Sequence, residues 1–197
     1  MSRPRKFLRR HSPRPRSWTL FERNLAAALY DLEPGEFLVL MREGTQYFVQ
    51  FADHGPYGMR VEAVGNPYLL PYSQLSETGI THLCSLGWSP PTYVQADVLI
   101  EPAEGSPNFF IDVSCPVKTG EVARVAVRTL REVYGAEAPS DLLYRAYSAE
   151  YDSIRFSQLG IKCLHAAEWE CAEILEKIEP ELTSSIQLPL AMPVEIS

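Results

Sequence analysis

Apolar residues in the first third of the chain recur first with the spacing of a helix and then with the spacing of strands. The helix is predicted to run up to Pro34-Gly35, a pair that cannot continue it. Thr19 and Glu22 have capping-box spacing, so Thr19 is the expected N-cap. The apolar positions of this helix are Leu20, Phe21, Leu25, Ala28, Leu29 and Leu32.

The residues that follow predict a three-stranded antiparallel meander. Residues 36–42 and 45–52 have the pattern of two strands joined by a Glu-Gly turn. A second turn over 53–58 leads to alternating residues at 59–65, which predict the third strand. One face of the meander is then available to the first helix.

Further helices and short strands are predicted after the meander. A weaker helix is expected over 72–86, with Gly87 as its C-terminal glycine cap. The clearest helix covers 121–134 and is apolar around most of its circumference, so we expect it to lie buried against the middle of the sheet. Additional extended segments are expected at 93–100, 108–113 and 142–147. The expected fold class is therefore α+β: an antiparallel sheet, a meander plus two to three further strands, packed by helices.

Charge and composition divide the chain into three predicted parts. Residues 1–17 form a proline-rich basic arm, which we expect to be disordered because it holds too few apolar residues to offset its ordering entropy. Residues 18–149 form the α+β domain. Residues 150–197 form a C-terminal extension with a short helical piece ending near Gly160, an amphipathic helix stopped by Pro180, and a tail.

The role of the basic arm stays open at the level of sequence. Residues 1–16 carry seven basic side chains and no acid, although the whole chain has a net charge of -7. One interpretation is that the arm binds an anionic partner such as nucleic acid, lipid or an acidic protein. The others are a contact with the acidic body of the same chain, a functionally idle tail, or a start codon placed too far upstream.

The sequence displays no recognisable catalytic, metal or cofactor motif. It has no P-loop, no G-x-G-x-x-G, no G-x-S-x-G and no H-E-x-x-H pattern. His54 follows Asp53 in a Gly/Pro turn, where a solvated turn is favoured over an acid–base pair. His82 and Cys84 are two residues apart and do not share a helix face. These patterns favour a protein that is not an enzyme and has neither a cofactor nor a metal.

The cysteines and the apolar runs indicate the cellular compartment in which we expect the protein. None of the four cysteines forms a C-x-x-C pair. With no export signal evident, we expect reduced, mostly buried thiols in a cytoplasmic protein. The longest strongly apolar run covers only 37–41, far short of the roughly 20 residues that a membrane-spanning helix needs, so no membrane contact is expected. The four cysteines are Cys84, Cys115, Cys163 and Cys171.

Four short motifs between about residues 83 and 147 carry a family resemblance. They are Leu86-Gly87-Trp88-x-Pro90-Pro91, Pro107-Asn108-Phe109-Phe110, Ala126-x-x-Thr129-Leu130-Arg131-Glu132-Val133-Tyr134-Gly135 and Leu143-Tyr144. In order and spacing this region resembles the YbjN/TY-Chap group of bacterial proteins, and it looks like the actinobacterial members. The resemblance implies the fold of type III secretion chaperones of the CesT/Tir class, with helices packed on an antiparallel sheet.

The resemblance implies a protein- or peptide-binding role, chaperone-like or adaptor-like, without catalysis. Client residues would be buried on an apolar sheet or helix surface, and an exposed strand edge would add backbone hydrogen bonds. A homodimer is compatible with the resemblance, and the alternative function is regulatory, with the basic arm on nucleic acid or another anion. The candidate partner-binding residues are Trp88, Phe109, Phe110, Arg124, Arg128 and Arg131.

Competing structural roles accompany these six candidates. For the three aromatic side chains, core or turn packing is favoured over lining a peptide groove, although the two roles overlap. The arginines form one narrow stripe on the helix over 121–134, where they would grip a carboxylate or phosphate. The favoured interpretation of the stripe is a solvated helix edge paired with neighbouring glutamates.

Overall fold

A computed structural model describes residues 17–92, 106–150 and 153–164 of the chain. Residues 1–16 of the predicted basic arm, the strand predicted at 93–100 and the amphipathic helix predicted after Leu164 lie outside these described residues. The predicted disorder of the arm and the predicted C-terminal helix therefore stay predictions. All statements below concern the described residues.

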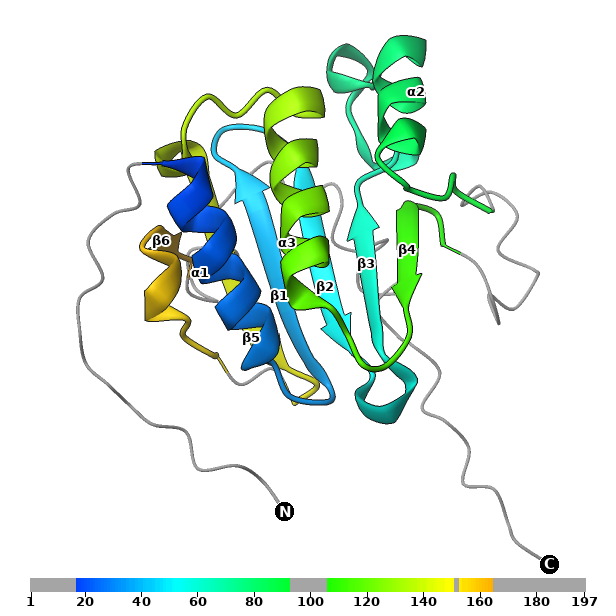
Figure 1. Ribbon diagram of the computed structural model, residues 1–197. Coiled ribbons are helices and arrows are strands. Elements are labelled where there is room, and N and C mark those ends of the chain that lie inside the picture. Colours follow the sequence, from blue (N-terminus) through cyan, green and yellow to red (C-terminus); the bar gives the residue numbers. More distant parts are fainter. Residues whose placement is uncertain (1–16, 93–105, 151–152, 165–197) are drawn as a thin grey trace, which may run out of the picture. The chain divides into compact units, whose positions relative to one another are not determined.

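A six-stranded sheet forms the centre of the domain, with strand order β4-β3-β2-β1-β5-β6. Every neighbouring pair is antiparallel except β5–β6, which is parallel. The meander predicted from alternation is confirmed as β1–β2–β3, and the α+β fold class is confirmed with it (Figure 1). The strands are β1 (Glu36–Arg42), β2 (Phe48–Asp53), β3 (Met59–Ala63), β4 (Phe109–Val113), β5 (Leu142–Ser148) and β6 (Lys162–Cys163).

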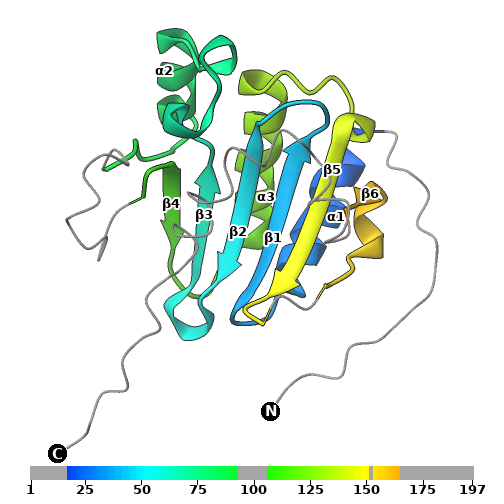
Figure 2. The same ribbon diagram turned by 180° about the vertical axis from the view of Figure 1, so that it is seen from behind.

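Two helices, α1 (Trp18–Tyr30) and α3 (Thr119–Arg128), lie side by side on one face of the sheet, as Figure 1 shows. Their apolar stripes pack on the inward-pointing strand residues, because alternate residues of a strand point to opposite faces. The third helix, α2 (Glu77–Ser85), lies beyond the ends of β3 and β4 (Figures 1 and 2). Fully buried members of this core include Phe21, Leu25, Leu38, Leu40, Val49, Phe51, Ala126 and Leu130.

Helix boundaries differ from the sequence predictions in ways that hydrogen bonds explain. The N-cap of α1 is Ser17 and not Thr19, since the Ser17 side chain accepts a hydrogen bond from the backbone N–H of Leu20. The helix predicted over 72–86 begins only at Glu77, after the Ser76 N-cap. A separate 3-10 turn at Pro71–Ser73 precedes it, because Gln74 and Ser76 have extended backbone angles.

The predicted helix over 121–134 is confirmed in position, but its last turn is a π-helix at Thr129–Val133. The Thr129 hydroxyl donates to the carbonyl of Val125, and the Tyr134 N–H donates to the carbonyl of Thr129 five residues earlier. Gly135, at φ 68°, then leaves the helix. The widened turn brings Tyr134 into the core, where its hydroxyl donates to the carbonyl of Val64.

Residues that follow the predicted domain boundary at 149 pack into the same core. Ile154, Phe156 and Leu159 are at most 5% exposed, and the Phe156 N–H donates to the Tyr144 hydroxyl at 3.0 Å. A 3-10 turn at Ser157–Leu159 ends at Gly160 with φ 67°, as the sequence predicts for the short helical piece. Strand β6 then pairs with β5, so Lys162–Cys163 extend the sheet.

Candidate functional site

No helix among the described residues covers the second face of the sheet, which Figure 2 shows from behind, with α1 and α3 on its far side. We call this the outer face. The odd-numbered residues of β1 and β5 and the even-numbered residues of β2, β3 and β4 point to it, since their neighbours point into the core. The described face is therefore free of helices while the other carries two.

An apolar cluster occupies the middle of the outer face, and we call it the apolar centre. Met41 lies between Phe48 of β2 and Leu143 of β5, directly opposite both in register. Phe37 lies opposite Tyr147, and their rings stack with centroids 5.1 Å apart. The apolar centre comprises Phe37, Val39, Met41, Phe48, Leu143 and Tyr147, and all but Val39 and Tyr147 are partly exposed.

Polar side chains line the β3–β4 side of the apolar centre. The Arg60 guanidinium makes two parallel hydrogen bonds to the Asp112 carboxylate, at 2.8 and 2.9 Å. The same guanidinium lies 5.3 Å from the centre of the Phe110 ring. Glu62 accepts hydrogen bonds from the side chains of Gln50 and Ser106. On this side of the outer face, charged side chains with hydrogen-bond partners therefore surround the aromatic ring of Phe110.

The opposite side of the apolar centre is basic. Arg145 of β5 lies beside Val39 in register, and its guanidinium is 4.8 Å from the centre of the Tyr147 ring. Lys162 of β6 is paired with Leu143 and is exposed. The outer face therefore combines an apolar middle with one basic border and one border of mixed charge.

The Arg60–Asp112 pair makes the stability of the β3–β4 pairing depend on pH. The hydrogen bonds from Arg60 hold the pKa of Asp112 below its ordinary value near 3.8. A depressed carboxyl pKa adds stability above the unfolded pKa and loses it as the pH falls through the lower folded value. We expect Asp112→Asn to cost roughly 0.5–1 kcal/mol at pH 7, since the carboxylate is more than half exposed, and the cost to shrink below about pH 4.

Urea titrations of the wild type and of Asp112→Asn at pH 7 and pH 3 measure this difference. A matched control is Asp141→Asn, which removes a carboxylate that accepts from the backbone N–H groups of residues 137 and 138 and from the Ser140 hydroxyl. An Asp112→Asn penalty of equal size at both pH values would contradict the assignment.

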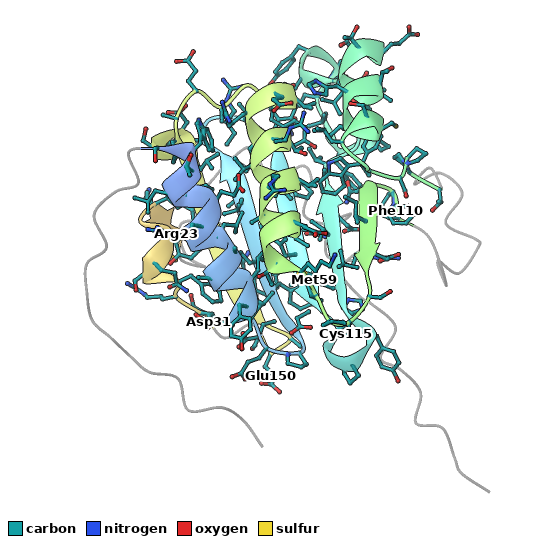
Figure 3. All side chains as sticks on the ribbon, viewed as in Figure 1. Arg23, Asp31, Met59, Phe110, Cys115 and Glu150 are labelled. Carbon is teal, nitrogen blue, oxygen red and sulfur yellow. The ribbon has the colours of Figure 1, made fainter. Side chains whose placement is uncertain are left out.

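The structure separates the three aromatic candidates. Trp88 is 3% exposed, and its indole N–H donates to the Thr129 hydroxyl at 2.8 Å. Phe109 is also 3% exposed and points into the core. Phe110 alternates with it and lies on the outer face against Arg60. Phe110, which Figure 3 labels on β4, is partly exposed, whereas the other two are buried.

The arginine stripe lies on the helical layer, away from the outer face, and each member has a partner. Arg124 is 3.6 Å from Glu22 of α1, which ties the two helices together. Arg128 makes two hydrogen bonds of 2.9 Å to Glu132, whose pKa is lowered mainly by this contact. The Arg131 guanidinium lies 5.4 Å from the centre of the Trp18 ring. These contacts match the structural interpretation of the stripe.

The predicted burial of the thiols is wrong for two of the three described cysteines. Cys84 is exposed on α2, and Cys115 is exposed in the loop after β4, where its thiol donates to the carbonyl of Gly55 (Figure 3). Cys163 is half-buried, and Cys171 lies outside the described residues. His82 contacts Glu132 at 3.1 Å, so it links α2 to the π-helical turn.

The described part of the chain holds neither a cluster of metal ligands nor a membrane-spanning helix. No three metal-ligating side chains come together there. None of the described helices has the length and apolar content to cross a bilayer.

Sequence reasoning missed the apolar centre, although a signal for it was present. Residues 37–41 are apolar without interruption, and a strand that packs on one face only would alternate with polar residues. The run therefore already indicated that the strand buries side chains on one face and presents apolar side chains on the other. Leu143 and Tyr147 also belong to the apolar centre, but they could be assigned to it only once β5 was known to lie beside β1.

Comparison with known proteins assigns the family. The family model described as "T3SS (YopN, CesT) and YbjN peptide-binding chaperone 3", TY-Chap3, matches residues 12–148. That span covers most of the chain and all of the sheet except β6, so the chain belongs to this family of peptide-binding chaperones. No curated protein and no solved structure matches the chain. The resemblance seen in the motifs around Trp88 and Phe110 is thereby confirmed.

Proposed function

We propose that this protein binds a peptide segment of a client protein on the outer face of its sheet, as a chaperone or adaptor without catalysis. The observation that supports the site is the apolar centre, where Phe37, Met41, Phe48 and Leu143 remain partly exposed on a face that no described helix covers. A contiguous exposed apolar patch with a polar border is typical of an interaction surface. Family membership supports a peptide as the ligand.

Burial on this face supplies enough free energy for a useful but reversible complex. A segment that removes about 500 Å² of apolar surface from water gains roughly 12 kcal/mol by transfer. Lost translational, rotational and side-chain freedom offsets several kcal/mol of this gain. The remainder corresponds to a dissociation constant on the order of micromolar, as suits a protein that must release its client.

An alternative mechanism is the addition of a client strand to an edge of the sheet. Parts of the described edges are already paired. On the free side of β4, Ser89 exchanges two backbone hydrogen bonds with Phe110, at 2.9 and 3.0 Å. On the side of β5 away from β1, Leu143 and Tyr144 pair with β6, and Tyr147 forms a bridge to Ser153. Backbone pairing is therefore taken at Phe110 on one edge and along part of β5 on the other, which favours burial on the outer face as the mechanism.

A charge placed in the apolar centre tests the proposal. Met41→Glu puts a carboxylate between Phe48 and Leu143, where a bound segment would have to desolvate it, so we expect affinity for a client peptide to fall at least 30-fold. Fluorescence anisotropy of labelled peptides with the full chain measures the effect. Met41 is partly exposed, so the variant should retain the fold.

Ala27→Glu is the matched control for this experiment. It adds the same charge to an exposed position of α1, on the other face of the sheet, in a residue type that helices accept. Peptide affinity should be unchanged in Ala27→Glu. Equal loss in the two variants, or none in Met41→Glu at full stability, would reject the outer face as the binding site.

A further inference from the structure

We draw no further inference here: the strongest candidate, the apolar centre in the middle of the outer face of the sheet, belongs to the site already described, and nothing among the described residues shows what covers it.

Discussion

Trp88→Ala is expected to lower the free energy of unfolding by about 3–5 kcal/mol, the usual cost of removing a fully buried tryptophan. Trp88 is 3% exposed and belongs to the single core cluster that the sheet and helices share. Its indole N–H also satisfies the hydroxyl of Thr129 in the π-helical turn, 41 residues away. The side chain thereby holds the segment after α2 against the end of α3. Thermal unfolding should show a decrease of roughly 10 °C in melting temperature for a domain of this size.

Trp88→Phe is the control that separates packing from hydrogen bonding. Phenylalanine retains much of the buried ring and loses the bond to Thr129, so the expected cost is about 1–2 kcal/mol. Peptide affinity, measured at a temperature where both variants are folded, should match the wild type, because Trp88 does not reach the outer face. A folded Trp88→Ala protein of normal stability that fails to bind peptide would show that the indole contacts the client directly.

The contrast between Phe109 and Phe110 shows how far the sequence leads. Alternation within a strand places the two rings on opposite faces, and that much is visible from their adjacency. Which ring is buried depends on the side of the sheet where α1 and α3 pack, and no residue near β4 carries that information. The same dependence explains why the resemblance motif around Trp88 looked like a candidate binding segment while its indole lies in the core.

The elements themselves were predictable because their signals are local. Periodicity located α1, α3 and the β1–β3 meander, and the glycines at 135 and 160 marked ends that the structure confirms. The position of the π-helical turn was not predictable, since helical periodicity does not reveal one widened turn. The apolar centre was not predictable either, because β5 joins β1 across about 100 residues of sequence. A site made from strands distant in the chain becomes visible only with the strand order.

Gly58→Ala is expected to destabilise the protein by more than about 3 kcal/mol, through a backbone clash added to backbone strain. Gly58 precedes β3 with φ 104° and ψ -144°, a conformation that residues with a Cβ rarely adopt. A Cβ built there would lie 1.9 Å from the carbonyl oxygen of Val113, the last residue of β4. Because that oxygen belongs to rigid backbone, β4 would have to move away from β3.

Gly87 provides the matched control for Gly58, because it has nearly the same φ, 101°, and a Cβ there would have no atom within 4 Å. Gly87→Ala should therefore cost only the backbone strain, roughly 1–2 kcal/mol. Urea denaturation of both variants measures the difference, which isolates the close approach of β4. Displacement of β4 also carries Phe110 and Asp112 away from Arg60, so the near-ultraviolet circular dichroism of Gly58→Ala should change while that of Gly87→Ala does not. Equal losses of stability in the two variants would contradict the tight contact between Gly58 and Val113.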